Sequence, residues 1–465
     1  EEMCVRLSHT LDAVERLETW EGNLLNWYDT KTLRTMHPRF CSAVDSGNFV
    51  CCLVALREGL MEYVPELPAL RGVCERLQSI VERTNLSAMY NEKKRLFHIG
   101  FDLETDKLSS SYYDLLMSEA RMMSYFAVAR RQVPKKHWGA LGRTLAGEGR
   151  YAGAVSWTGT MFEYYMPHLL LPAWEGSLLY ESLGFCLYCQ RKKASERGLP
   201  WGCSESAYYA FDPQFQYQYK AHGIQRLGLK RMSGREYVIS PYSSFLTLPM
   251  HPQVSLRNLR RLKKLGATGE FGFYEAIDFT SKRCGGAPYA VVRSYMAHHV
   301  GMSLCALVNA LSDNLLQKRF LRSEMAAAEE LLKESVPSGA AVFEDVVRRD
   351  VPEKPGRTTN QIEEYDDIHP RAPRMHLLSG AGYTLLLSDN GSSVSMCQGV
   401  DITRRSADVL RRPQGVFAVV KGAGVCFCLS RAPDYREAAA HRVEFAPSYA
   451  AFYARKGVLE GGVSA

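Results

Sequence analysis

Apolar residues recur at three- and four-residue intervals over most of this chain, and this spacing constrains the fold more than any other feature. It extends from the start of the chain to about Pro337, in runs such as GNFVCCLVALREGLMEYV, SYYDLLMSEARMMSYFAVARRQV, VSLRNLRRLKKLGA and RSYMAHHVGMSLCALVNALSDNLLQKRF. The period places apolar side chains on one face of an α-helix, so each run is predicted to form one helix. A large, mainly helical domain is expected.

The texture of the chain then changes. The segment from Gly356 to Met375 is polar and contains proline, which is typical of a linker. Beyond it come short β-like runs, including GYTLLLSDNGSSVSMC with a predicted hairpin turn at Asp389, Asn390 and Gly391. We therefore expect a helical domain over residues 1–340, a linker over 341–375 and a truncated antiparallel β-sandwich over 376–465.

Composition removes several classes of function. The 57 basic residues exceed the 50 acidic ones by only seven, with no sustained basic block, so nucleic-acid binding is not indicated. Neither a P-loop nor a dinucleotide glycine motif is present. No apolar run is long enough to span a membrane and no signal peptide is visible, while the missing initiator Met indicates a piece of something longer.

The thirteen cysteines are scattered, which is not the pattern of a disulfide framework and favours a reducing compartment. Cys186 and Cys189 form a CxxC pair in a helix-like run without a second pair or nearby histidines. A metal site is therefore not expected there.

Carboxylates surrounded by aromatic residues are the most informative local pattern. Glu163 lies in WTGTMFEYYMP, Glu205 and Asp212 lie in PWGCSESAYYAFDPQFQYQY, and Glu275 and Asp278 lie in GEFGFYEAIDFT. Cleavage of a glycosidic bond needs two carboxyl groups, and aromatic walls stack on sugar faces. Any single one of these carboxylates could instead cap a helix or pair with an arginine, but three such clusters together favour a sugar site.

The run RSYMAHHVGMS adds weaker candidates. His298 and His299 are adjacent, so on a helix they point in different directions and do not readily share one ion. Substrate hydrogen bonding or core packing is preferred for at least one of them. Arg293 and Tyr295 could line the same cleft, with a buried structural arginine as the equal competitor.

Seven segments together resemble the glucoamylase-like domain of cyclic β-1,2-glucan synthases. They are YDTKTLRTMHPRFCSAVDSGNFVCCLVALREGL, SYYDLLMSEARMMSYFAVARRQVPKKHWGALGR, GTMFEYYMP, PWGCSESAY, YQYKAHGIQRLGLKR, GFYEAIDFT and RSYMAHHVGMSL. The later HLLSGAGYTLLLSDNGSSVSMCQGVDITR resembles the opening of the β-sandwich that leads the glycoside-phosphorylase domain of the same proteins. The resemblance implies an (α/α)6 toroid that cyclises linear β-1,2-glucan by retaining transglycosylation, without a cofactor or metal. It also implies a cytoplasmic segment of a bacterial inner-membrane synthase whose other domains are partners.

Carried over to this sequence, the resemblance points to Glu205 and Glu275 as acid and nucleophile in either order, with Glu163 as the nearest rival. Tyr180 and Cys203 depart from the family pattern without removing a carboxylate. The expected substrate-binding residues are Trp201, Tyr208, Asp212, Tyr217, Tyr219, Tyr274, Asp278, Glu181, Arg293, Tyr295, His298 and His299. Two alternatives stay open, an endo-acting β-1,2-glucan hydrolase and a non-catalytic module that holds the glucan.

Overall fold

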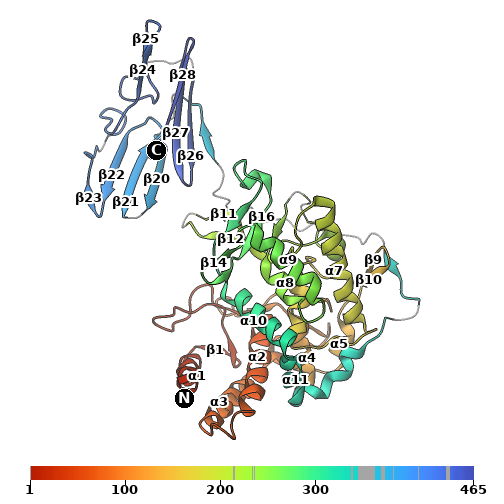
Figure 1. Ribbon diagram of the computed structural model, residues 1–465. Coiled ribbons are helices and arrows are strands. Elements are labelled where there is room, and N and C mark those ends of the chain that lie inside the picture. Colours follow the sequence, from red (N-terminus) through yellow and green to blue (C-terminus); the bar gives the residue numbers. More distant parts are fainter. Residues whose placement is uncertain are drawn as a thin grey trace. The chain divides into compact units, whose positions relative to one another are not determined.

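The structure is a computed structural model that describes residues 2–212, 215–232, 234, 236–336, 339–343, 362–367, 372–380, 382–406, 408–435 and 440–465. Most of the predicted linker, namely 344–361 and 368–371, lies outside these residues. The chain divides into two compact units, residues 1–209 with 219–353, and residues 210–218 with 354–465 (Figure 1).

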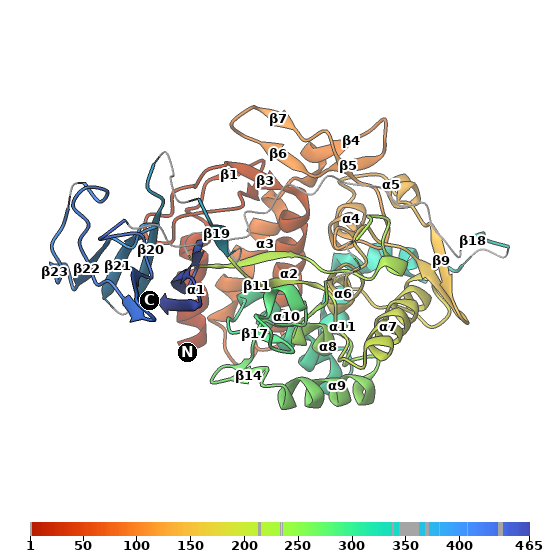
Figure 2. The same ribbon diagram turned by 90° about the horizontal axis from the view of Figure 1, so that it is seen from above.

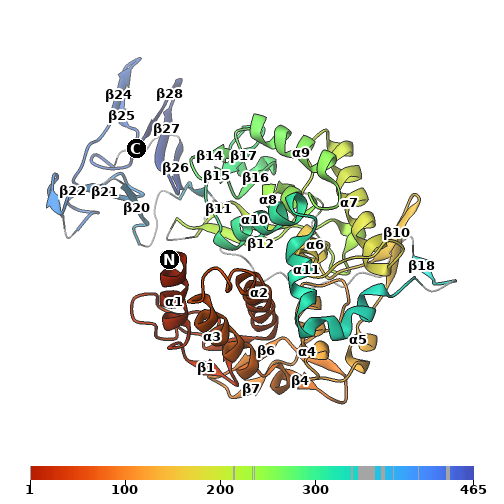
Figure 3. The ribbon, with the colours of Figure 1, turned by 60° about the horizontal axis from the view of Figure 1, so that its bottom comes forward.

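The first unit is built mainly from helices that pack against partners distant in sequence. Its helices are α1 (Glu2–Val14), α2 (Ala43–Met61), α3 (Leu70–Arg83), α4 (Arg121–Ala129), α5 (Lys136–Ala140), α6 (Met161–Tyr165), α7 (Leu178–Arg197), α8 (Pro241–Leu246), α9 (Pro252–Lys264), α10 (Ala297–Leu311) and α11 (Leu315–Arg322). Helix α2 packs against α3, α4 and α11, while α8 packs against α9 and α10 (Figure 3). One continuous apolar core runs through these helices.

Short strands occupy the connections between the helices. They are β1 (Thr19–Trp20), β2 (Asn23–Leu24), β3 (Phe40–Ser42), β4 (Tyr90–Asn91), β5 (Leu96–His98), β6 (Gly100–Asp102), β7 (Lys107–Leu108), β8 (Tyr112–Tyr113), β9 (Leu145–Glu148), β10 (Tyr151–Ala154), β11 (Glu205–Phe211), β12 (Tyr217–Ala221), β13 (Val238–Ile239), β14 (Thr268–Gly269), β15 (Gly272–Phe273), β16 (Ala276–Asp278), β17 (Ala290–Val292) and β18 (Val342–Phe343). Figure 2 shows β3 to β7 gathered at one edge of the helices. The connections are therefore structured and can carry a site.

Two of the predicted helices are confirmed. The run GNFVCCLVALREGLMEYV lies in α2 up to Met61. The start of α2 is capped by Ser42, whose side chain accepts a hydrogen bond from the backbone N–H of Asp45. The run VSLRNLRRLKKLGA, which is basic and has leucines at helical spacing, forms most of α9. Helix α9 buries Leu259 and Leu262 and leaves its charged side chains exposed. Apolar periodicity located these helices because one face of each is buried.

Two other runs were predicted as single helices, and the structure contradicts both predictions. In SYYDLLMSEARMMSYFAVARRQV only α4 is helical, because the segment before it pairs with a loop: Leu116 N–H donates to Gly142 O, and Gly142 N–H donates to Asp114 O. The run from Arg293 to Phe320 breaks into α10 and α11. At the break, Asp313 and Asn314 adopt the left-handed conformation, which no helix continues through.

The second unit is a sandwich of antiparallel sheets. Its strands are β19 (Glu363–Tyr365), β20 (Met375–Gly380), β21 (Tyr383–Ser388), β22 (Ser393–Cys397), β23 (Val400–Asp401), β24 (Val419–Gly422), β25 (Val425–Cys428), β26 (Ala440–Ala446), β27 (Tyr449–Lys456) and β28 (Leu459–Ser464). One sheet has the order β19-β26-β27-β28 and the other β20-β21-β22-β23. Leu387 of the second sheet packs against Phe445 and Phe452 of the first. The predicted turn at Asp389–Gly391 is confirmed between β21 and β22.

No helix among the described residues is both long enough and apolar enough to cross a bilayer.

Candidate active site

A cavity of 1120 Å³ lies within the first unit. Three carboxyl side chains line it, those of Asp45, Glu119 and Glu205. We call it the carboxylate cavity. Its aromatic lining consists of Trp27, Phe40, Phe49, Tyr113, Phe162 and Tyr219. A roomy, largely apolar hollow with a few convergent polar groups is the usual form of a ligand site.

Elements far apart in sequence bring the three carboxyl groups together. Asp45 lies in the first turn of α2, directly after the capping Ser42. Glu119 lies in the bend just before α4, where its backbone carbonyl accepts from Met122 N–H. Glu205 is the first residue of β11, and its carbonyl accepts from the hydroxyl of Tyr242. The backbone at each position is fixed by local structure, which holds the side chains toward the cavity.

Glu119 and Glu205 are half-buried. They differ from the fully buried carboxylates of this unit because the fold does not use their side chains. Within the described chain, neither side chain has a hydrogen-bond or ion-pair partner. Burial, and secondarily the charge of Glu163, raises the pKa of Glu205 to about 7. Burial, and then the charges of Glu205 and Asp45, raises the pKa of Glu119 well above its usual range. Carboxyl groups that hold a proton near neutral pH are suited to acid–base work.

The phenol of Tyr113 reports the common environment of these groups. Burial raises its pKa first, and the charges of Glu119, Asp45 and Glu205 raise it further. All three carboxyl groups therefore act on one ring in the cavity wall.

Glu163, predicted as the rival catalytic residue, is placed by the structure in a bracing role. Its carboxylate accepts from the backbone N–H groups of Trp157, Thr158 and Thr160 and from the hydroxyls of Ser156, Thr158 and Thr160, at 2.6–3.2 Å. With Thr160 it forms the capping box of α6. It does not belong to the described lining of the carboxylate cavity. The carboxylate is saturated with donors, so it has no lone pair left for a substrate.

Glu275, the other predicted catalytic residue, lies one layer behind the cavity wall. Its Oε1 accepts from Ala207 N–H at 3.1 Å, and its Oε2 lies 2.9 Å from Nδ1 of His299. His299 stacks on the ring of Tyr242 at 3.8 Å, and its Nε2 lies 3.4 Å from the hydroxyl of Tyr219. Tyr219 lines the cavity. Glu275 thus reaches the site through His299 and Tyr219.

Three further predicted residues have structural partners instead of positions on the cavity. Trp201 is buried and exchanges backbone hydrogen bonds with the side chain of Asn258. Asp278 is fully buried and pairs with Arg283 at 2.7 Å. The ring of Tyr208 is buried below the guanidinium of Arg283, 4.7 Å from its centroid. The arginine-pairing alternative for these carboxylates therefore holds for Asp278.

The remaining predicted residues divide in a simple way. His298 lines the cavity, whereas His299 is buried behind it. Their rings lie edge to face with centroids 4.1 Å apart, so the two side chains do not diverge as the sequence predicted. Glu181 is exposed in the first turn of α7. The described cavity lining does not include Asp212, Tyr217, Tyr274, Glu181, Arg293 or Tyr295.

Sequence reasoning missed Asp45 and Glu119. Glu119 has no aromatic neighbours in sequence and stands in the mostly apolar stretch LLMSEARMM, which is predicted to be helical. The available signal is a single acid in a mostly apolar run, because burying an unpaired charge is costly without a function.

All thirteen cysteines are free. Cys186 and Cys189 are buried on α7, and burial raises the pKa of both thiols. No cluster of three or more metal-binding side chains occurs in the part of the chain that the structure describes.

Comparison with known families agrees with this architecture. Residues 111–324 match the Glycoamylase family of glucoamylase-like sequences, and residues 359–464 match the glycosyl hydrolase 94 supersandwich domain. The first match lies mostly in the helical unit and the second in the β-sandwich unit. The chain thus matches a glycoamylase-like domain followed by a glycosyl hydrolase 94 supersandwich domain, which confirms the resemblance drawn from the sequence.

One relative is the cyclic beta-(1,2)-glucan synthase NdvB of Rhizobium meliloti (strain 1021), with 28% identity over 550 aligned residues. That alignment covers 90% of this chain, and the chain spans only 19% of the relative's length. An endo-beta-1,2-glucanase from Chitinophaga pinensis, solved with sophorotriose and glucose, superposes with a TM-score of 0.56 at 16% identity, covering 71% of this chain and 81% of its own. An endo-beta-1,2-glucanase from Talaromyces funiculosus, solved with sophorose, gives 0.53 at 13% identity, covering 74% and 77%. These two structures share the fold.

Proposed function

We propose that this chain acts on β-1,2-glucan and rearranges it by retaining transglycosylation, closing a linear glucan into a ring. The observation that carries the proposal is the pair of unpaired, proton-holding carboxyl groups, Glu119 and Glu205, in the aromatic-lined carboxylate cavity. The linkage is taken from the names of the relatives, a β-1,2-glucan synthase and two β-1,2-glucanases. Glu119 replaces Glu275 and Glu163 in the pair expected from the sequence.

The two carboxyl groups are assigned different roles by how firmly each holds its proton. Glu119 is affected by burial and by the charges of both Glu205 and Asp45, so it is the acid that stays protonated. Glu205 ionises first and serves as the nucleophile. Environments that separate the proton affinities of two acids are the usual way of dividing these tasks.

The reaction then proceeds in two displacements. The Glu205 carboxylate attacks the anomeric carbon and forms an ester bond while the glycosidic C–O bond breaks and Glu119 gives its proton to the leaving oxygen. A hydroxyl at the other end of the same glucan chain attacks the anomeric carbon next. Glu119 takes the proton of that hydroxyl, and Glu205 leaves as a carboxylate.

Transfer instead of hydrolysis requires that sugar occupies the acceptor side of the cavity and excludes water. The aromatic rings of Trp27, Phe49 and Tyr219 supply flat surfaces for that purpose. Aromatic faces bind sugar rings without needing a charge, so they can hold a neutral acceptor in place.

The pair Glu275 and His299 is proposed to position Tyr219. The carboxylate fixes the orientation of the imidazole, and the imidazole holds the Tyr219 hydroxyl beside the cavity. Tyr219 is therefore pre-oriented to make a hydrogen bond to a sugar hydroxyl near Glu205, and Glu275 acts at one remove from the substrate.

Endo-hydrolysis of β-1,2-glucan is the second candidate, because the solved structures with this fold include two endo-β-1,2-glucanases. The same carboxyl groups would serve it, with water as the acceptor. Incubation of the chain with linear β-1,2-glucan separates the two. Transglycosylation gives rings one water lighter than linear glucans of the same number of glucose units and releases the reducing-end remainder, so the number of reducing ends does not increase. Hydrolysis raises the number of reducing ends steadily.

Unchanged glucan under these conditions would refute both reactions and favour the non-catalytic, glucan-holding module.

We also propose that the helical unit follows the (α/α)6 toroid plan and that the chain works as the cyclising part of a larger membrane-bound synthase. The 19% coverage of the synthase relative supports the latter. A cytoplasmic location stays a prediction.

A further inference from the structure

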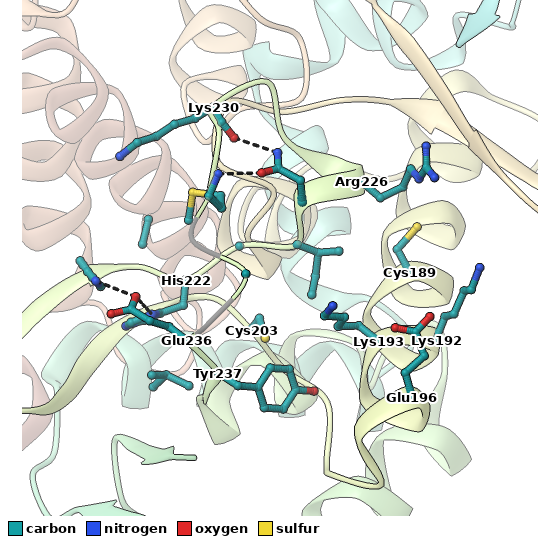
Figure 4. Close-up of a pocket in the computed structure, with 18 of the residues that line it drawn as sticks. Cys189, Lys192, Lys193, Glu196, Cys203, His222, Arg226, Lys230, Glu236 and Tyr237 are labelled. Carbon is teal, nitrogen blue, oxygen red and sulfur yellow. Dashed lines mark hydrogen bonds and ion pairs between the residues drawn. The ribbon is translucent and has the colours of Figure 1, made fainter. Parts of the chain in front are cut away.

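A second cavity, separate from the carboxylate cavity, lies against helix α7 (Figure 4). Its volume is 440 Å³, within the range of small-molecule sites. One wall is a single face of α7, formed by Cys189, Lys192, Lys193 and Glu196 at helical spacing. The opposite wall comes from the segment around His222 to Arg226 and from Glu236 to Val238. We call it the α7 pocket.

Much of the opposite wall belongs to the part of YQYKAHGIQRLGLKR that follows Tyr219, from Lys220 to Lys230, and the proposed reaction does not use this part. This segment is held firmly. Ile224 N–H donates to Gly159 O, and Lys230 N–H donates to Trp157 O, so the main chain is tied to the turn braced by Glu163. Gln225 Nε2 also donates to Lys230 O at 3.1 Å. The wall is therefore preformed.

The charges that line the α7 pocket do not balance. Glu148 is neutralised by Lys192 and by Arg226, whose Nε lies 2.7 Å from it. Glu236 is neutralised by Lys220 at 2.7 Å and by Arg283, from behind the wall, at 2.6 Å. The third carboxylate, Glu196, is exposed at the rim.

Lys193 and Lys230 bring the lining cations to five, against three carboxylates. Neither has an ion-pair partner among the residues that the structure describes. Figure 4 shows Lys193 extending from α7 toward Cys203, across the pocket. The described lining thus has an excess of about two positive charges. The ammonium group of Lys193 is available to bind an anion inside the pocket.

His222 adds a polar group that carries no charge. It is buried, and burial lowers its pKa to about 3, so the imidazole is neutral at physiological pH. Its Nδ1 lies 4.0 Å from Glu236 Oε2, and its Nε2 has no hydrogen-bond partner within the described chain. A neutral imidazole offers one donor and one acceptor, which suits a hydroxyl group.

We propose that the α7 pocket binds a sugar phosphate, a small polyhydroxylated phosphate monoester. A phosphate monoester carries about −1.5 to −2 charges at pH 7, which matches the cationic excess of the lining. Lys193 faces the phosphate, while the imidazole of His222 and the carboxylate of Glu236 face the hydroxyls. Charge-assisted hydrogen bonds to phosphate are stronger than neutral ones, so the ammonium group supplies much of the affinity.

The site is separate from the carboxylate cavity but shares a strand with it. Along β12, Tyr219 lines the carboxylate cavity and the next residue, Lys220, lines the α7 pocket. Successive side chains of a strand point to opposite faces, so one strand serves both walls. The proposal goes beyond the proposed function and does not depend on it.

Isothermal titration calorimetry of the full 465-residue chain with glucose 6-phosphate tests the proposal by measuring the binding affinity. Glucose and gluconate are the comparison ligands. We expect saturable binding of glucose 6-phosphate, weaker binding of gluconate and none of glucose. Lys193→Met should weaken glucose 6-phosphate binding by about tenfold or more, because it removes a charged hydrogen-bond donor. Lys264→Met, at an exposed lysine in the last turn of α9, removes the same charge elsewhere and should leave binding unchanged.

Each other outcome overturns the proposal. Absence of saturable binding shows that the pocket binds no such ligand. Equal affinity for glucose shows that the pocket does not recognise the phosphate group. Binding that survives Lys193→Met, or that long β-1,2-glucan displaces, places the ligand elsewhere. The titration is repeated with Glu205→Gln, which we expect to bind glucose 6-phosphate normally even though it cannot process glucan, so failure of one proposal is distinguishable from failure of the other.

Discussion

The carboxylate of Glu275 lies 2.9 Å from Nδ1 of His299, and the two side chains are only 1% and 3% exposed. A carboxylate and an imidazole this enclosed cannot both touch a substrate in the carboxylate cavity. They can, however, fix the direction of what His299 contacts, which is the hydroxyl of Tyr219. In the proposed mechanism the pair therefore orients a cavity side chain and does not itself contact the glucan.

Glu275→Gln should lower kcat about tenfold through loss of Tyr219 orientation, with little change in KM, because Gln keeps the volume and an acceptor for Ala207 N–H. Steady-state kinetics on linear β-1,2-glucan measure kcat and KM separately. Tyr219→Phe should reproduce the defect, and combining the two changes should add little to either. Additive losses would contradict the positioning role.

Glu119→Gln and Glu205→Gln should each lower the rate of ring formation by at least about a thousandfold, because each removes one partner of the acid–nucleophile pair. Mass spectrometry of the products follows the loss. Glu181→Gln is the matched control, since Glu181 is exposed in the first turn of α7. A near-normal product profile from either cavity variant would remove that residue from the pair.

The pH dependence of transfer should place its acidic limb near pH 7, which is unusually high for a carboxylate nucleophile. Glu205 must be ionised to attack, and burial raises its pKa to about 7. Activity is therefore lost as the pH falls through about 7. Initial rates between pH 5 and 9, measured below saturation, report the limb; a midpoint near the ordinary carboxyl value would contradict the assignment.

Replacing the Glu205 carboxyl should stabilise the protein in alkaline solution. Its folded pKa of about 7 lies above the ordinary 4.5, so the folded state holds a proton that the unfolded chain releases. Stability is thus lost as the pH rises from about 4.5 through 7, and at pH 8 the free energy of unfolding of Glu205→Gln should exceed that of the native chain by roughly 3 kcal/mol. Urea denaturation at pH 8 and pH 4 measures this. The advantage should disappear at pH 4.

Glu163→Gln should have the opposite effect to Glu205→Gln, because it should lower the free energy of unfolding and leave the catalytic activity unchanged. The amide cannot accept from the donors that now converge on both oxygens, so we expect a decrease of roughly 2–4 kcal/mol in the free energy of unfolding. Activity per folded molecule, assayed well below the melting temperature, should stay within about twofold of normal. Complete inactivation of well-folded protein would return Glu163 to the catalytic candidates.

The sequence predicted the two-part architecture because period and composition report burial directly. Periodicity located α2 and α9, and the Asp-Asn-Gly triplet located the turn between β21 and β22. It did not locate the end of α10 at Leu311, because the apolar pattern continues through the left-handed break at Asp313 and Asn314. Backbone conformation at such a point is set by tertiary contacts as well as by residue type.

The sequence predicts Glu205, which lines the carboxylate cavity, and pairs it with Glu275 or Glu163, whereas our proposal pairs it with Glu119. Glu163 and Glu275 look catalytic in sequence because aromatic neighbours surround them, yet the backbone around Glu163 and the imidazole beside Glu275 use those carboxylates. Glu119 lacks any such partner within the described residues. Whether a buried acid is satisfied depends on donors from distant segments, and sequence spacing does not contain that information.

The main-chain links between the turn at Trp157 and the segment around Ile224 limit how this region can vary. A methyl group at Gly223 would meet the carbonyl oxygen of Thr158 at 1.7 Å, so even alanine forces the two strips of backbone apart. The two hydrogen-bonded backbone segments can therefore move only together, and we expect proteases to cleave neither of them readily. Grafted loops or affinity tags would therefore have to enter somewhere else in the molecule.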